Sequence, residues 1–344
     1  MKKQVFLVMV FCALGSARSL PFQDQVPIHF KGLTLVPNLI LGNSTAENES
    51  FGTPSSVAAD YAGRLFVADF TKKKILIYSE DGKFLDTIGD KPKAKVEFDG
   101  PRSIFIDSSG NLFIADSSRA IKRNRIITLS EDGELISSFK IPMVPQKIIA
   151  HGGSVFVNQR MSSYPCNIYE FSFNGKKIGE YENVEGLEEE KAVAGMTIDK
   201  DGFIYSAGRF IPVVRRYSME GRLISTHEYQ PKIKNRVDDP IQLTVFSGVQ
   251  TAKGVLFRSE GREYPVCWDI AVDGRGFIYL LVARDHKKEQ FCALFRFDPS
   301  FQVIEEVDLP FLCSRIYIDS SNRFYFFSPG ITRCLIRCEA RYSE

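Results

Sequence analysis

Two short turns recur along this chain of 344 residues, with apolar segments between them. The first turn places Asp before Gly or Asn in most copies, and it reads Asp60-Tyr-Ala-Gly63, Asp107-Ser-Ser-Gly110, His151-Gly-Gly153, Asp199-Lys-Asp-Gly202, Asp273-Gly-Arg-Gly276 and Asp319-Ser-Ser-Asn322. The second turn reads Ser79-Glu-Asp-Gly82, Ser130-Glu-Asp-Gly133, Ser172-Phe-Asn-Gly175, Ser218-Met-Glu-Gly221 and a looser Asp298-Pro-Ser300. Asp and Ser bond their own backbone in turns and Gly accepts a positive φ, so these positions predict sharp reversals between strands.

Apolar segments flank each first turn, as Ile104-Phe-Ile106 and Leu112-Phe-Ile114 do around Asp107. The second turn joins a third strand to a fourth, which predicts a four-stranded antiparallel meander. The first turn recurs every 43 to 49 residues, apart from one interval of 74 between Gly202 and Gly276. Four strands in a period of this length are typical of propeller blades, which bury both faces only by stacking on neighbours. We therefore expect an all-β, six-bladed β-propeller.

The long interval holds about thirty extra residues, approximately 230–264, between blades four and five. They lack the pair of turns, so we interpret them as an inserted hairpin in a single domain spanning residues 20–344. The sixth repeat ends without a fourth strand. The strand-like segment 28–40 is expected to supply it and to close the ring, leaving no open edge.

Residues 1–19 have the features of a secretory signal peptide: Lys2 and Lys3, an apolar run from Val5 to Leu14, and small residues beyond it. We expect a secreted or periplasmic protein. Phe11 stands where a lipid-anchored protein would have a small residue, so an anchor at Cys12 is disfavoured. No later apolar run is long enough to predict a transmembrane span.

Residues 54–69 and 101–116 resemble the NHL repeat of six-bladed propellers, through Pro-x-x-Val/Ile followed by the turn and by Leu-Phe-Val/Ile-Ala-Asp. Later repeats follow the pattern less closely, since Gln159, Gly208, Val282 and Ser328 stand where it has Asp69 and Asp116. The resemblance implies the fold and leaves the function open, because such propellers include both binding proteins and enzymes.

The two ends of the propeller differ in predicted charge. We call the end with the first and second turns the turn face, and the end with the connections from second to third strands the loop face. Innermost strands begin at the loop face with Arg102, Lys147, Arg315 and the single carboxylate Asp269, and the surrounding loops are basic. We predict a binding site there, formed by Arg102, Arg119, Lys122, Arg123, Arg160, Arg209, Trp268, Asp269, Arg284 and Arg315.

The expected partner is an anionic glycan, a lipid head group or an acidic protein segment, since Arg binds carboxylates and phosphates bidentately. Solvation of the loops by these same charges is the alternative. The overall charge of +2 argues against a nucleic-acid binder. An enzyme of the lactonase, lyase or glycan-acting kind, using Trp268, Asp269 and Arg102, is a further alternative. We identify no catalytic residues, cofactor or metal site, because the four His are scattered and no His-x-x-x-His or Cys-x-x-Cys spacing occurs.

Six cysteines follow the predicted signal peptide, and export would permit disulfides. Cys267 and Cys313 each stand six places before a turn Asp, in adjacent blades, so they are the pair expected to bond if any do. Buried free thiols are the alternative for the same residues.

Overall fold

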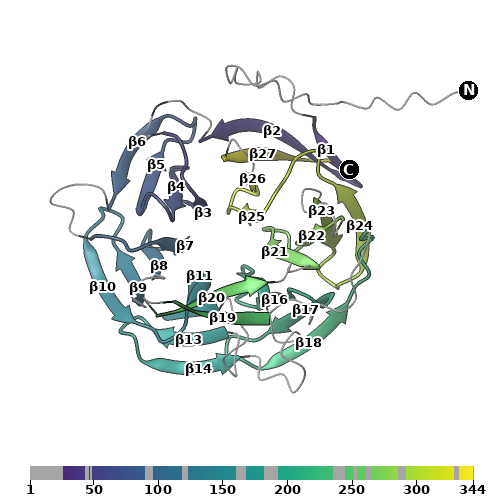
Figure 1. The fold of residues 1–344 in the computed structure, drawn as a ribbon. Helices are drawn as coiled ribbons and strands as arrows, with labels where there is room; N and C mark the ends of the chain where they lie inside the picture. Colours follow the sequence, from purple (N-terminus) through teal and green to yellow (C-terminus); the bar gives the residue numbers. More distant parts are fainter. Residues whose placement is uncertain are drawn as a thin grey trace, which may run out of the picture.

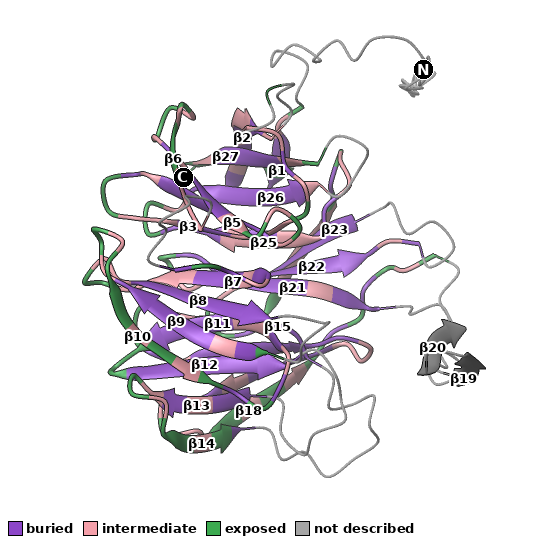
Figure 2. Ribbon diagram, turned by 60° about the vertical axis from the view of Figure 1, so that its left-hand side comes forward, coloured by how far each residue is buried: buried purple, intermediate pink, exposed green. Residues whose placement is uncertain are grey.

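The computed structural model describes residues 26–42, 46, 49–89, 96–117, 123–159, 168–181, 193–234, 245–251, 254–260, 265–285, 292–328 and 333–343. Its blades are antiparallel sheets arranged in a ring around a central axis (Figure 1), and the side view shows them stacked face against face (Figure 2). The fold is a six-bladed β-propeller, as the recurring turns predicted.

Each of the first five blades runs from an innermost to an outermost strand in chain order. Blade one contains β3 (Pro54–Ala59), β4 (Leu65–Asp69), β5 (Lys74–Tyr78) and β6 (Phe84–Ile88), and blade two contains β7 (Pro101–Ile106), β8 (Leu112–Ser117), β9 (Asn124–Leu129) and β10 (Leu135–Lys140). Blade three contains β11 (Pro145–His151), β12 (Ser154–Gln159), β13 (Ile168–Ser172) and β14 (Lys177–Tyr181). Blade four contains β15 (Val193–Ile198), β16 (Ile204–Gly208), β17 (Val213–Tyr217) and β18 (Leu223–Glu228). Blade five contains β21 (Cys267–Val272), β22 (Ile278–Ala283), β23 (Cys292–Phe297) and β24 (Val303–Asp308).

The sixth blade joins the two ends of the described chain. Its inner strands are β25 (Arg315–Ile318), β26 (Phe324–Ser328) and β27 (Cys334–Tyr342), and β2 (Leu33–Leu41) pairs antiparallel with β27. The predicted closure by an N-terminal strand is therefore confirmed. A short strand, β1 (Ile28–Phe30), pairs with β2 and adds a fifth strand at the rim.

The long interval between blades four and five contains β19 (Val245–Thr251) and β20 (Gly254–Glu260). These two strands pair with each other in an antiparallel sheet of their own.

The core is divided among the interfaces between blades. Each of the six hydrophobic clusters combines side chains from neighbouring blades, and the cluster around Leu41, Leu65 and Tyr325 joins the last blade to the first. Because every interface lies between two blades, removal of any one blade would expose apolar surface on both of its neighbours.

The recurring Asp residues have local structural roles. Asp107 Oδ1 accepts hydrogen bonds from the backbone nitrogens of Ser109 and Asn111, both at 2.9 Å, which fixes the first turn. At the other end of the next strand, the carboxylate of Asp116 accepts a bond from Gly100 N at 2.8 Å and holds the connection that enters the blade. The presence of Asp at both positions is thus explained by the hydrogen bonds that it accepts from backbone N–H groups.

Candidate functional site

The loop-face end of the channel contains a polar cluster built around Asp269, which is 2 % exposed. Lys147 Nζ lies 2.8 Å from Asp269 Oδ1. The other carboxylate oxygen accepts a hydrogen bond from Ile316 N at 3.2 Å, and Ile270 N donates to Oδ1 at 3.0 Å. Asp269 therefore links blades three, five and six.

The fourth blade makes this long-range pair possible. Gly195 stands between Lys147 and Asp269 in the ring, and a Cβ atom on it would lie 2.2 Å from Asp269 Oδ1. Any side chain there would displace the carboxylate, since contacts below 3.0 Å do not occur for real Cβ atoms. The absence of a side chain at Gly195 lets Lys147 reach past one blade to the next.

Two arginines and the single tryptophan of the chain join the cluster. Arg315 Nη1 donates to the carbonyl oxygen of Trp268 at 3.3 Å, and the Arg209 guanidinium carbon lies 5.9 Å from the centroid of the Trp268 ring. Burial lowers the pKa of Arg315 below its ordinary value, the charge of Asp269 raises it, and the charge of Arg209 lowers it. Lys147, Arg209 and Arg315 thus share one region with one carboxylate.

The other predicted rim residues are distributed more widely. Arg102 stacks over Phe70, with its guanidinium carbon 4.6 Å from the ring centroid. Arg123, which is half exposed, lies 3.6 Å from Asp99 Oδ2 through Nη1. Arg284 contacts Glu306 and Asp308 on the outer strand β24 of its own blade. Arg119, Lys122 and Arg160 lie outside the described residues.

Cys267 and Cys313, the pair expected to bond if any do, are buried free thiols in the structure. Cys267 Sγ donates to the carbonyl oxygen of Asp269 at 3.4 Å, and Cys313 Sγ donates to that of Arg315 at 3.0 Å. Each thiol thus faces the backbone of its own segment. Burial raises the pKa of Cys267 to about 12 and that of Cys313 well above its ordinary value.

The serines at the start of the inner strands bind neighbouring backbone. Ser56 Oγ accepts a hydrogen bond from Ile104 N at 3.1 Å, and Ser103 Oγ accepts one from Ile148 N, also at 3.1 Å. Each bond joins one blade to the next, so the small polar side chains stabilise the ring.

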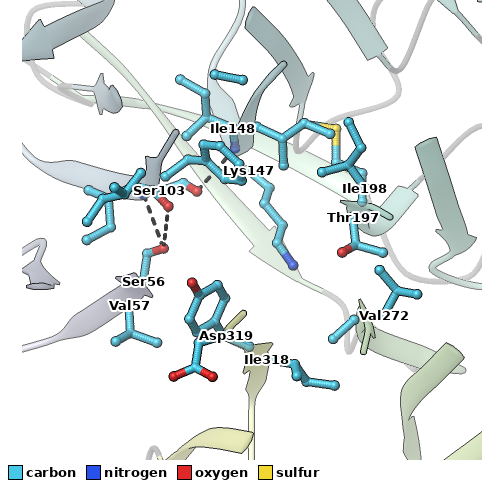
Figure 3. Close-up of a pocket in the computed structure, with 18 of the residues that line it drawn as sticks. Ser56, Val57, Ser103, Lys147, Ile148, Thr197, Ile198, Val272, Ile318 and Asp319 are labelled. Carbon is cyan, nitrogen blue, oxygen red and sulfur yellow. Dashed lines mark hydrogen bonds between the residues drawn. The ribbon is translucent and has the colours of Figure 1, made fainter. Parts of the chain in front are cut away.

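A cavity of about 770 Å³ occupies the propeller axis (Figure 3). Its loop-face end is lined by the polar cluster, including Lys147, Asp269 and Arg315. Its turn-face end is lined by exposed residues of the first turns, such as Tyr61 and Lys200. The charge pattern of the sequence predicts binding only at the loop face. The period-two pattern of the inner strands identifies their apolar residues. The sequence does not show how wide the space between the six strands is, because that width depends on closure of the ring.

Within the described ranges, no group of three or more His, Cys, Asp or Glu side chains is arranged to hold a metal ion. No helix in this part of the chain is long and apolar enough to cross a membrane.

Comparison with known proteins agrees with the fold. The profile of a family described as a 6-bladed beta-propeller matches residues 43–156. No curated protein matches the sequence.

Among solved structures, a Bacteroides fragilis protein is similar at 10% identity and a TM-score of 0.62, over 91% of this chain and 96% of that one. A Bacteroides vulgatus protein is similar at 11% identity and a TM-score of 0.59, over 91% and 99%. Virginiamycin B lyase from Staphylococcus aureus is similar at 14% identity and a TM-score of 0.51, over 89% and 99%. These structural similarities show a shared fold, and at such low identities they carry no function to this chain.

Proposed function

We propose that this propeller is a binding module that recognises an anionic partner on its loop face. The main observation in support is that Lys147, Arg209 and Arg315 lie together beside Trp268, around a single carboxylate, that of Asp269. Fixed positive charge at the mouth of a channel attracts anions, and its low-dielectric walls strengthen the interaction. Lys147, Trp268 and Arg315 are each partly exposed, so an anionic group could reach them.

The partner class follows from the kind of charge. Guanidinium groups bind carboxylates, sulfates and phosphates through paired N–H donors, and the neighbouring indole ring of Trp268 offers a surface for stacking a sugar or a planar group. An acidic glycan combines both features. The predicted signal peptide supports export, which would expose the loop face to such polymers.

Retention on heparin-agarose in rising sodium chloride tests this proposal. The wild-type protein is expected to elute at higher salt than R209Q and than the triple variant R119E/K122E/R123E, because binding through several charges weakens as salt rises. The control variant K83E/K176E/R222E has the same change of charge on exposed positions that follow second turns, so it lies on the turn face. Equal elution of the two triple variants would overturn a specific site on the loop face.

A further inference from the structure

The axial cavity also opens on the turn face, away from the arginines discussed above. Its lining there includes Tyr61, Ser109, Gly152 and Lys200, all exposed residues of first turns, whereas the lining at the opposite end is buried or half-buried. A volume of about 770 Å³ lies within the usual range for small-molecule sites, roughly 300–1,000 Å³. The cavity is thus accessible to a small ligand from the turn face.

The walls next to this opening are apolar. Ala59, Ile106, Ile198, Val272 and Ile318 each stand directly before a turn and line the cavity. Figure 3 shows Ile198, Val272 and Ile318 around the open space, together with Thr197 of blade four. A hydrocarbon body would be stabilised by each CH₂ group that it buries against such walls.

The opening itself carries negative charge. Five turn carboxylates surround it, and two of them form ion pairs, Asp60 with Arg64 and Asp319 with Arg323. The other three, at Asp107, Asp199 and Asp273, accept hydrogen bonds from neutral groups, which are backbone N–H groups and the side chains of Asn111, Tyr205 and Tyr279. Lys200, which also lines the opening, forms an ion pair with Asp201 at 3.3 Å. Neutral donors leave the charge of a carboxylate in place, so the opening favours a cation.

Two exposed aromatic rings add to this preference. Tyr61 is 72 % exposed and Phe173 is 37 % exposed, and both line the cavity at the turn face. The face of an aromatic ring attracts ammonium groups, including quaternary ones. Aromatic rings and carboxylates together at one opening form a suitable site for an organic cation.

We propose that the axial cavity binds an organic cation with an apolar body through the turn face. The apolar body occupies the space between the inner strands, and the charged group lies among the first turns. This orientation follows from the loop-face end of the cavity, where the positive charges of Lys147 and Arg315 repel the charged group of the ligand. The charged group of this ligand lies at the opposite end of the cavity from the proposed anion site, and its binding does not require an anion there.

Isothermal titration calorimetry with three probes of equal chain length tests the ligand class. Octyltrimethylammonium, octanoate and octanol share an eight-carbon body and differ in charge. The two ionic probes are used below their micelle concentrations and octanol below its solubility limit. The cation is expected to bind about tenfold or more tightly than the other two, a difference that corresponds to about 1.4 kcal/mol. Equal binding of all three, or no heat with the cation at millimolar concentration, would overturn the proposal.

Matched variants locate the binding site. T197F places a large ring in the cavity and is expected to abolish binding, whereas T226F makes the same substitution on the exposed strand β18 and should leave it unchanged. D107N removes one charge at the opening and keeps the oxygen that fixes the turn, while D132N removes a charge from an exposed second turn. Weaker binding by D107N alone supports the site.

Y61A provides a test that does not depend on packing, because Tyr61 is exposed. This variant should weaken binding of the cation about threefold to tenfold and leave the unfolding transition unchanged. Unchanged affinity in both Y61A and D107N would show that the cation binds elsewhere, and so would retained binding in a folded T197F.

Discussion

Lys147 Nζ lies 2.8 Å from Asp269 Oδ1, across a blade whose corresponding residue is Gly195. This ion pair connects blade three to blade five within the ring. Asp269 is buried, and Lys147 keeps about a quarter of its side chain in contact with solvent.

K147M is expected to destabilise the protein by about 2 kcal/mol, because it leaves a buried carboxylate without its cation. The loss is smaller than for a completely buried pair, since Asp269 keeps two backbone N–H donors. Urea unfolding measures the effect. The double variant K147M/D269N should recover part of the loss, and an unfolding midpoint of K147M equal to that of the wild type would contradict the assigned role.

Closure by β2 gives a second prediction. Leu35 is completely buried and pairs with Ala340 of β27, whereas its half-buried neighbour Thr34 points to the other side of the strand. L35A should cost about 3 kcal/mol and T34A less than about 1 kcal/mol. Deletion of residues 28–40 should lower the melting temperature of the entire protein. An unchanged melting temperature after deletion would show that the ring does not need this strand.

Two glycines in equivalent second turns should differ in their tolerance of a side chain. Gly221 and Gly133 have φ values of 81° and 78°. A Cβ on Gly221 would lie 1.6 Å from the ring of Tyr181, whereas one on Gly133 would meet nothing within 4 Å. G133A should therefore cost about 1 kcal/mol of backbone strain, and G221A clearly more. Thermal unfolding of the two variants compares them, and equal losses would mean that Tyr181 moves aside freely.

His227 should make stability depend on pH. Its ring stacks on Phe301 with 3.8 Å between centroids, and Nε2 has no hydrogen-bond partner among the described residues. Burial lowers the pKa of His227 below its ordinary value of 6.5. The unfolded chain therefore binds a proton before the folded protein does, so the contribution of His227 is present above pH 6.5 and is lost as pH falls below it.

The variant H227F keeps an aromatic ring at this position and removes the titration. Urea unfolding at several pH values should show that the wild type loses stability relative to H227F as pH falls below 6.5. A constant difference between the two proteins across this range would exclude a role for His227 protonation.

The sequence predicts the blades well because the signals for them are local. The turn at Asp107 is fixed by bonds to nitrogens two and four residues away, and the apolar pattern around it identifies the strands. The repetition of these signals also predicts the number of blades. Segment 28–40 was identifiable as the missing strand since the last repeat lacked one.

The candidate site was less predictable because its contacts join residues far apart in the chain. The sequence places Lys147, Asp269 and Arg315 on inner strands, but their association depends on Gly195 and on the distance between blades. The cysteine positions left open a bond or two buried free thiols, and in the structure Cys267 and Cys313 are free thiols that each contact a backbone carbonyl oxygen.

The sequence by itself therefore determined the six blades, the turns that shape them and the strand that closes them. These features depend on hydrogen bonds and apolar periodicity within short segments. Only the tertiary structure decided which arginines lie together and which contact acidic neighbours, as Arg284 does with Glu306. It also decided that an apolar cavity reaches the turn face, because the width of the channel is set by the packing of all six blades around one axis.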